Sequence, residues 1–304
     1  MDKIKKLGLT ALAGSLVATS VSAADLGVTG SWSWSWDSAD SDESGNPMSM
    51  GDSVNFSASG ETDQGWTATA AWELDGGNFD DQSLSLDFGD GGVLQYGGTS
   101  KGGRGVGLVA DYVPNADTPV YSATDSGGTE YGVARGASGN DNVSHQITVV
   151  DIKIGAEIHK GAGTSTSWGF QYSGIDNFTV GFGSSNIDPG AKGGGNESST
   201  IGAKYAIGGI TLGYQMTEVD KSATYEDAVH YGASFAVNDD LTISYGRQTV
   251  ELQGKASDEV NSGFSASYTM GSMSIGAYVN KTENQSGASA SNDEGKGVTV
   301  SISF

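Results

Sequence analysis

Apolar and polar residues alternate along most of the chain after residue 24. In the first such run, residues 26–36, the even positions are apolar or Gly and most odd positions carry hydroxyl groups. Successive side chains of a β-strand point to opposite faces, so a period of two predicts strands with one apolar and one polar face. The pattern recurs to the last residue and predicts sixteen strands, with apolar faces in 26–36, 54–58, 66–74, 84–88, 94–96, 143–149, 152–158, 168–172, 178–182, 201–207, 210–216, 229–237, 241–245, 260–270, 273–279 and 298–304.

The connections between these strands alternate in length. Short turns rich in Gly, Asn and Asp occupy 60–65, 89–92, 173–177, 238–240 and 271–272. Longer acidic or Gly/Ser-rich loops are predicted at 37–52, 184–198, 217–228, 248–259 and 281–297, and the longest connection is 97–142. Short turns on one rim and long loops on the other are typical of a transmembrane barrel. Pairing of the first strand with the last would leave no open sheet edge.

The polar faces of the predicted strands consist mainly of Ser, Thr, Asn and Gln. Five charged residues also fall on these faces: Glu73, Asp87, Lys153, Glu157 and Lys204. All six Trp lie on the apolar faces, often near a strand end, as in the aromatic girdles of membrane barrels. We therefore predict an all-β fold, a 16-stranded antiparallel transmembrane β-barrel with a polar, water-filled lumen. Tyr278 falls on a polar face, and we attribute this exception to a β-bulge.

A secreted protein with two packed sheets and one polar surface would show the same alternation. The number of strands, the alternating loop lengths and the presence of only 4 Pro favour the membrane barrel. At the N-terminus, three Lys, an apolar stretch and the small residues 21–23 predict a signal peptide at 1–23, which leaves 24–304 as the barrel. The remaining chain contains no stretch approaching the ~20 apolar residues of a transmembrane helix.

Charge and composition exclude several classes of function. The chain has 37 Asp+Glu against 15 Lys+Arg, and a formal net charge of −22 argues against nucleic-acid binding. It has no Cys, which excludes disulfides, thiolate metal sites and cysteine nucleophiles. The 3 His form no recognisable Ser/His/Asp spacing, so we expect no enzyme activity. The Gly-rich stretch 97–105 lacks the Gly-Lys-Ser/Thr ending of a phosphate-binding loop.

A cluster of acids in one predicted loop raises the question of metal binding. Ca²⁺ prefers several oxygen ligands, and the candidate ligands are Asp37, Asp40, Asp42 and Glu43. The sequence has neither a regular twelve-residue calcium loop nor a Gly-Gly-x-Gly-x-Asp repeat. A solvated acidic surface accounts for the cluster better, so we expect no cofactor, with calcium bound to the acidic loops as the alternative.

The last predicted strand ends on an aromatic residue, in the pattern Val298-x-Val300-x-Ile302-x-Phe304. This ending resembles the assembly signal of Gram-negative outer-membrane proteins. Together with the sixteen strands, the signal peptide and the long 97–142 segment, it makes the chain resemble a general diffusion porin of the alphaproteobacterial, Rhodobacter-like type. The resemblance implies an outer-membrane homotrimer in contact with the lipid bilayer and lipopolysaccharide. It also implies insertion by the barrel-assembly machinery, with Phe304 as the signal.

In that family the third long loop folds into the barrel and narrows the channel, which implies that 97–142 is the constriction loop. Within it, 105–114 resembles the short plug segment. The resemblance makes the charged residues of this loop candidates for the constriction: Asp111, Asp117, Asp125, Glu130, Lys101, Arg104 and Arg135. Porins of this type commonly place Arg or Lys on the first few strands, whereas the first four strands predicted here carry no inward basic residue.

The five inward charges on the strands comprise three acids and two bases. Beneath strongly acidic loops, such a lumen raises the local concentration of cations. The sequence therefore predicts passive diffusion of ions and small hydrophilic solutes with mild cation selectivity. Two alternatives remain open at this point. One is a substrate-selective channel with a solute site in the third loop, and the other is a barrel that acts as a surface adhesin.

Overall fold

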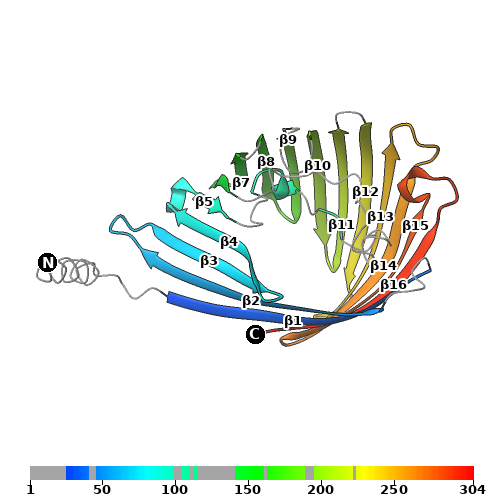
Figure 1. The fold of residues 1–304 in the computed structure, drawn as a ribbon, viewed down its shortest axis with the longest axis horizontal. Coiled ribbons are helices and arrows are strands. Elements are labelled where there is room, and N and C mark those ends of the chain that lie inside the picture. Colours follow the sequence, from blue (N-terminus) through cyan, green and yellow to red (C-terminus); the bar gives the residue numbers. More distant parts are fainter. Residues whose placement is uncertain are drawn as a thin grey trace, which may run out of the picture.

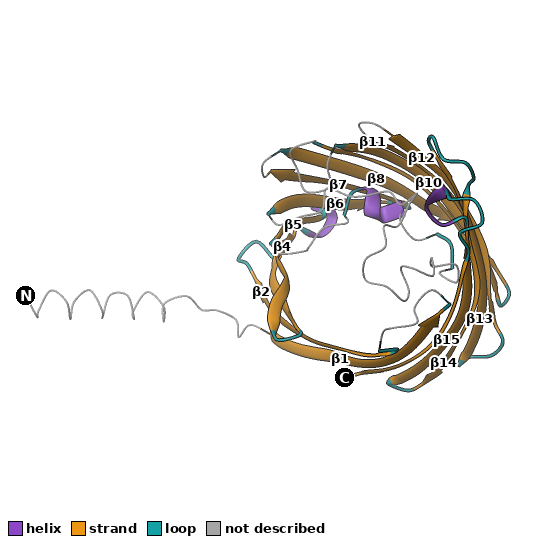
Figure 2. Cartoon of the chain, turned by 45° about the vertical axis from the view of Figure 1, so that its right-hand side comes forward, coloured by secondary structure: helices purple, strands orange, loops and turns teal. Residues whose placement is uncertain are grey.

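The barrel predicted from the alternation is present in the structure. The computed structural model describes residues 25–40, 46–98, 104–109, 112–114, 141–160, 163–188, 195–221 and 224–304. Within these ranges, sixteen antiparallel strands form one closed barrel in which each strand pairs with the next and β1 pairs with β16 (Figure 1). Figure 2 shows the strands curving around an open lumen.

Most strands are long, and the described residues also include three short 3₁₀ helices, η1 to η3. The strands are β1 (Asp25–Ala39), β2 (Met48–Glu61), β3 (Thr67–Asp75), β4 (Asn78–Asp87), β5 (Val93–Gly97), β6 (Asn142–Val149), β7 (Ile152–Lys160), β8 (Thr164–Ile175), β9 (Phe178–Ile187), β10 (Asn196–Ile207), β11 (Ile210–Lys221), β12 (Thr224–Ala236), β13 (Leu241–Leu252), β14 (Glu259–Met270), β15 (Met273–Glu283) and β16 (Asp293–Ser303). The helices are η1 (Gly89–Gly91), η2 (Val106–Val109) and η3 (Gln285–Gly287). No helix in the described ranges is long and apolar enough to cross a membrane.

The two faces of each strand differ as predicted. Large apolar side chains at alternate positions are exposed on the outside, as Ile201 at 48% and Phe264 at 61% illustrate. Aromatic pairs also lie on the outer face, including Trp168 with Phe182 at a centroid distance of 5.4 Å. The intervening inward positions are largely polar. An apolar outer belt around a polar lumen suits a barrel whose solvent is lipid on the outside and water on the inside.

At one end of the barrel the strands extend further than their apolar pattern predicts. The predicted loop 217–228 is wrong, because β11 continues to Lys221 and β12 begins at Thr224. The connections predicted at 37–52, 184–198, 248–259 and 281–297 are likewise shorter than expected. Outward positions here are polar, as Glu218 shows, but backbone pairing does not require apolar side chains. The ladder therefore continues beyond the apolar belt.

The turns at the opposite rim are short, as predicted. Several of them need a backbone in the left-handed region, which Asn177 adopts at φ 61° and Gly271 at φ 60°. Gly and Asn reach this region at the lowest steric cost, which is why they mark these hairpins in the sequence.

Tyr278 does not lie on a bulge, so that interpretation is wrong. It pairs with Ser265 on one side and Gly297 on the other in an unbroken register. Its hydroxyl group donates a hydrogen bond of 2.6 Å to Asp37 Oδ1 on β1. A Cβ atom at Gly297 would overlap the tyrosine ring. The missing side chain of Gly297 thus lets an inward-facing ring lie across β16 and reach β1.

Candidate pore constriction and lumen wall

Part of the predicted constriction loop lies inside the barrel. Residues 104–109, which include η2, and 112–114 follow the inner wall, with η2 beside β8 and β9 (Figure 1). Val106 and Val109 are fully buried, and Tyr112 and Val113 are 3% and 4% exposed. For these residues, the inward fold predicted for loop 97–142 is confirmed.

Much of the inner wall beneath this segment lacks side chains. Seven of the inward positions that it contacts on β7 to β12 are glycines, which we call the glycine track: Gly155, Gly169, Gly181, Gly183, Gly202, Gly213 and Gly232. A Cβ atom at Gly155 would overlap the Arg104 carbonyl oxygen, and one at Gly202 would lie 2.6 Å from the Tyr112 ring. Only glycine allows the loop to approach the sheet so closely.

Our sequence reasoning missed the glycine track, although the sequence carries a signal for it. Gly155, Gly169 and Gly183 are direct partners across β7, β8 and β9. Gly213 and Gly232 face each other on β11 and β12. Glycine weakens an isolated strand, so its repetition at matched inward positions indicates that another backbone packs there.

Hydrogen bonds to inward side chains of β7 and β8 hold residues 104–106 against the inner wall. The Arg104 N–H donates to Glu157 Oε2 at 3.0 Å, and the Val106 N–H donates to Ser167 Oγ at 3.1 Å. The Ser167 hydroxyl in turn donates to Glu157 Oε1 at 2.8 Å. Glu157 is only 4% exposed. This residue, predicted as a lining charge, therefore lies beneath the loop segment and holds it in place.

Tyr112 fills the space above the glycine track. Its hydroxyl oxygen accepts a hydrogen bond of 3.0 Å from Gln171 Nε2. Burial raises the pKa of the Tyr112 phenol. Lys204 Nζ lies 5.9 Å from the centroid of the ring, near the outer limit of a cation–π contact. Lys204 itself is exposed on an inward position, so it remains a candidate for the pore lining.

The wall formed by β1 to β4 consists largely of hydroxyl groups. As predicted, these four strands carry no Lys or Arg. Glu73 on β3 accepts hydrogen bonds from the Ser53 hydroxyl and from Asn55 Nδ2. Asp87 lies at the short-turn rim, where it accepts a 2.8 Å hydrogen bond from the Gly89 N–H. Lys153 is half-buried on β7, opposite Gln171 of β8.

The remaining charged candidates of the constriction loop lie outside the described residues: Lys101, Asp111, Asp117, Asp125, Glu130 and Arg135. Of the candidate charges in this loop, only Arg104 is described. Burial lowers the pKa of its guanidinium group, which still remains protonated at any physiological pH.

Because the strands are longer than predicted, more acids occupy inward positions. The predicted balance of three inward acids to two bases is therefore wrong. The additional inward residues include Asp37, Lys221, Glu226, Glu259 and Asp293. Glu259 is fully buried and accepts hydrogen bonds from Asn261 Nδ2 at 3.0 Å and from the Ser286 N–H at 2.7 Å. Lys221 forms an ion pair with Glu226. The alternation would have revealed these residues if it had been extended into the predicted loops.

One inward area is apolar, contrary to the expected polar lining. Ala228, Val250 and Leu252 form a buried cluster on β12 and β13, and Val219 on β11 is 2% exposed. These positions lie at the end of the barrel with the longer connections.

The calcium candidates are only partly described. Asp37 points inward, where it accepts hydrogen bonds from Tyr278 and from the Ser35 hydroxyl, the latter at 2.8 Å. Asp40 follows the end of β1, and Asp42 and Glu43 lie outside the described residues. The described part of the chain contains no group of three or more His, Cys, Asp or Glu placed to hold a metal ion.

Phe304 extends the pairing that closes the barrel. Its N–H donates to the Gly30 carbonyl at 2.9 Å, and the Gly30 N–H donates to the Phe304 carbonyl at 2.7 Å. The ring covers Gly30, where a Cβ atom would lie 2.6 Å from it, and the residue is 70% exposed. The terminal aromatic is thus presented on the outside of the closing strands.

Comparison with known proteins identifies the family. The family described as Gram-negative porin matches residues 8–304. The chain belongs to the Gram-negative porins. The same fold occurs in a porin refined at 1.8 Å, with a TM-score of 0.70, 16% identity, and coverage of 92% of this chain and 100% of the other. Comparison with curated proteins gives no match.

Two further structures have similar barrels. An anion-selective porin from Comamonas acidovorans has a TM-score of 0.69 and 14% identity, covering 92% of this chain and 100% of that one. The trimer form of OmpT, an outer membrane protein of Vibrio cholerae, has a TM-score of 0.66 and 12% identity, covering 93% and 100%. The family and the fold place this porin in the outer membrane as a diffusion channel.

Proposed function

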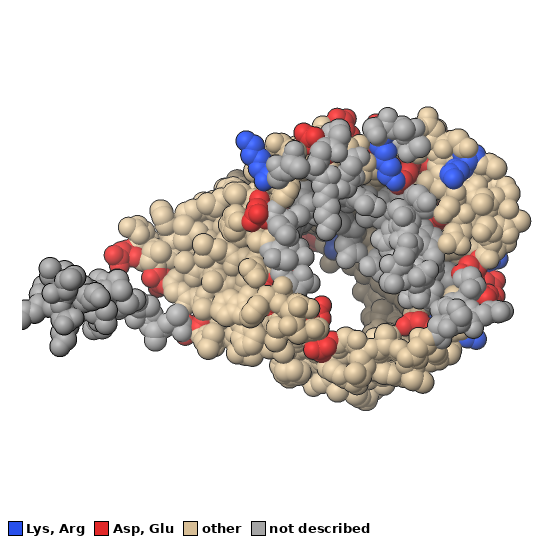
Figure 3. Space-filling model, in the orientation of Figure 1, with Lys and Arg blue, Asp and Glu red and all other residues tan. Residues whose placement is uncertain are grey.

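We propose that this porin is a passive channel for ions and small hydrophilic solutes with mild cation selectivity and no catalytic activity. The observation that carries this proposal is the charge of the lumen wall. The strands β1 to β4 carry Glu73 without any Lys or Arg, and further inward acids follow on β12, β14 and β16. Figure 3 shows the opening through the molecule, with Asp and Glu side chains beside it.

The inward bases offset these acids only in part. Lys221 is paired with Glu226, which leaves Lys153 and Lys204 as the other inward bases on the described strands. A lumen with excess negative charge concentrates cations and repels anions. Hydroxyl groups along the wall hydrate solutes of either charge, so the bias toward cations is expected to be mild.

The test is the reversal potential of single channels in a planar bilayer under a KCl gradient. We expect a potential of cation-selective sign. Glu73→Gln should lower the K⁺/Cl⁻ permeability ratio by about twofold, and Lys204→Gln should raise it by about twofold. A potential of anion-selective sign in the wild-type protein would refute the selectivity. Small conductance steps blocked by one particular solute would instead favour a substrate-selective channel.

We further propose that the porin assembles as a homotrimer, contacts lipopolysaccharide and is inserted by the barrel-assembly machinery. The trimer form of the Vibrio cholerae protein supports the oligomeric state. The exposed Phe304 at the closing strands supports its role as the assembly signal. The acidic, Gly-rich composition, with 48 Gly, supports the alphaproteobacterial subtype.

Calcium binding to the acidic loops remains a proposal. Because Asp37 is already engaged by Tyr278 and Ser35, Asp40, Asp42 and Glu43 are the better candidates. Calcium titration of the wild-type porin and of Asp40→Ala and Asp42→Ala tests this, with thermal stability as the readout. Equal responses in all three proteins would refute it.

A further inference from the structure

An apolar groove lies on the outer surface of β12 to β15. It has a volume of about 580 Å³. Small side chains, Ala233, Ala266 and Ala277, form its floor, and larger side chains that include Phe235, Tyr245 and Phe264 form its sides. The rings of Tyr245 and Phe264 lie 4.8 Å apart, tilted by 47°. Such a groove between aromatic side chains suits the acyl chain of a lipid.

Basic residues stand immediately above this groove. Arg247, Ser262 and Lys281 are direct neighbours across β13, β14 and β15. On each strand they lie two residues from a groove residue, Tyr245, Phe264 or Val279, toward the rim that carries the connections 253–258 and 284–292. Lys296 of β16 pairs with Val279 and so lies at the side of the groove.

This concentration of positive charge is unusual in a chain of net charge −22. Among the described strands, the outward positions carry four Lys or Arg, and three of them are Arg247, Lys281 and Lys296. The fourth is Lys160, at the end of β7 on another part of the barrel. The three therefore form one basic cluster beside the aromatic groove on β12 to β15.

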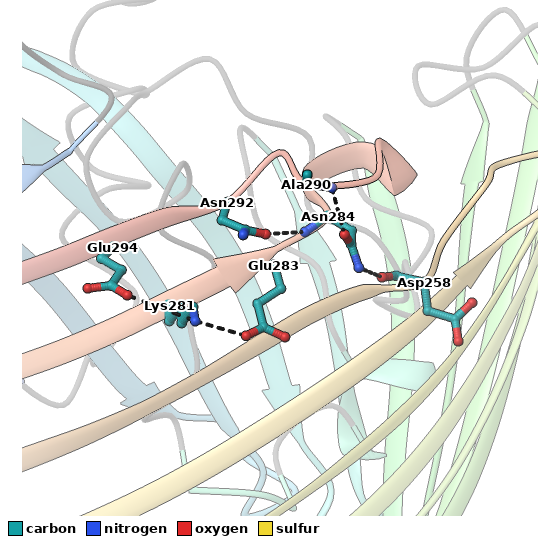
Figure 4. Close-up of polar contacts among 7 residues, drawn as sticks. All are labelled: Asp258, Lys281, Glu283, Asn284, Ala290, Asn292 and Glu294. Atoms are coloured by element: carbon teal, nitrogen blue, oxygen red, sulfur yellow. Dashed lines mark hydrogen bonds and ion pairs between the residues drawn. The ribbon is translucent and has the colours of Figure 1, made fainter.

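The three basic residues differ in how they are compensated. Lys281 forms ion pairs with Glu283 at 2.9 Å and with Glu294 at 3.9 Å (Figure 4). Arg247 and Lys296 form no ion pair with any residue in the described ranges. Arg247 and Lys296, on either side of the ion-paired Lys281, are therefore available to bind an external anion.

The position of the cluster along the strands indicates which leaflet it faces. Beyond Arg247 and Lys281 the strands lead into the connections 253–258 and 284–292, on the same rim as the 97–142 loop. Long connections mark the extracellular side of an outer-membrane barrel. Arg247 and Lys281 thus lie at the outer-leaflet interface, with the groove below them in the apolar belt and Lys296 at its side.

We propose that this surface binds the lipid A portion of lipopolysaccharide. Arg247 and Lys296 contact its phosphate groups, and an acyl chain lies in the groove over Ala266. We choose lipid A as the ligand because its phosphate groups complement the charges of Arg247 and Lys296, which have no ion-pair partner among the described residues. This inference rests on the proposed outer-membrane orientation and assigns a site to the proposed lipopolysaccharide partner.

The test uses the full-length folded porin, freed of bound lipid and titrated with lipid A in detergent. Native mass spectrometry reports the bound lipid. The double variant Arg247→Gln/Lys296→Gln should bind lipid A at least about tenfold more weakly. Lys160→Gln is the matched control, because it removes an outward cation elsewhere and should leave the affinity unchanged. Ala266→Trp fills the groove floor and should also weaken binding.

Several results would overturn the proposal. Equal affinity of the double variant and the wild type would exclude Arg247 and Lys296 as the phosphate site. Equal binding of dephosphorylated lipid A would exclude phosphate recognition, and equal binding of phosphatidylglycerol would exclude specificity for lipid A. A smaller trimer fraction with unchanged lipid binding would assign the groove to a second copy of the chain. Conductance of the same proteins tests the channel function separately, since neither residue faces the lumen.

Discussion

At the scale of single residues, side chains that span neighbouring strands fix the shape of the lumen. Tyr278 projects from β15 across Gly297 of β16 and donates its hydroxyl hydrogen to Asp37 of β1. These three strands meet where the barrel closes. The bond therefore links the strands on either side of β16 from within the lumen. A hydrogen bond to a charged acceptor contributes more than one between neutral groups.

We expect Tyr278→Phe to lower the free energy of unfolding by about 1–2 kcal/mol, because the hydrogen bond to Asp37 is lost while the ring remains over Gly297. Urea-induced unfolding of the membrane-inserted protein measures this difference. Tyr268→Phe is the control, since Tyr268 is an outward residue of β14 that is 40% exposed. Equal losses in the two variants would show that the bond to Asp37 contributes nothing.

Tyr112 provides a second test at this scale, through pH. Burial raises the pKa of its phenol above the ordinary value of about 10, so the folded state favours the neutral form. The stability that this contributes is fully present below about pH 10 and is lost as pH rises through the raised pKa. We expect the thermal stability of Tyr112→Phe to fall less steeply between pH 9 and 12 than that of the wild type, because Phe has no phenol to ionise. An identical decline in both proteins would contradict this.

At the scale of elements, the constriction depends on a match between a loop and a sheet. The glycine track leaves room for the backbone at 104–106 and for the Tyr112 ring, and Glu157 and Ser167 hold the backbone there. Hydrogen bonds to buried loop N–H groups satisfy donors that would otherwise lack a partner. The position of the loop is therefore set by the wall as much as by the loop sequence.

We expect Gly202→Ala to reduce single-channel conductance, because the new Cβ atom would lie 2.6 Å from the Tyr112 ring and push it toward the pore axis. The overpacking should also cost about 1–3 kcal/mol of stability. Gly276→Ala is the matched control: Gly276 is an inward glycine on β15 with nothing within 4 Å of its added Cβ. Equal conductance of the two variants would contradict a fixed loop on the track.

The sequence predicts the elements of this fold better than their ends or the constriction. Sixteen strands and their faces follow from a period of two, which is a local property. The ends of β11 and β12 do not follow from this period. Outward residues such as Glu218 become polar where the lipid ends, although the strands continue to pair. The role of Glu157 depends on which loop packs over it, and alternation carries no information about that. Tyr278 shows the same limit, since its place depends on Gly297 of the next strand.

At the scale of the whole molecule, charge is distributed unevenly between the two surfaces of the barrel. Acids exceed bases by 37 to 15 in the chain, and the described strands β1 to β4 carry no base at all. Three of the outward bases gather on β13, β15 and β16. The excess negative charge is thus available to the lumen and its mouths, where it acts on ions through water over distances comparable to the Debye length.

If this field sets the selectivity, salt should weaken it. We expect the K⁺/Cl⁻ permeability ratio to fall toward that of free diffusion as KCl rises from about 0.1 to about 1 M, because the Debye length shortens from about 10 to about 3 Å. Reversal potentials at a fixed concentration gradient measure the ratio. The permeability ratio of Lys204→Gln should exceed that of the wild type at low salt, and the two ratios should converge at high salt. A ratio independent of salt would mean that direct ion contacts, rather than the field of the lumen acids, set the selectivity.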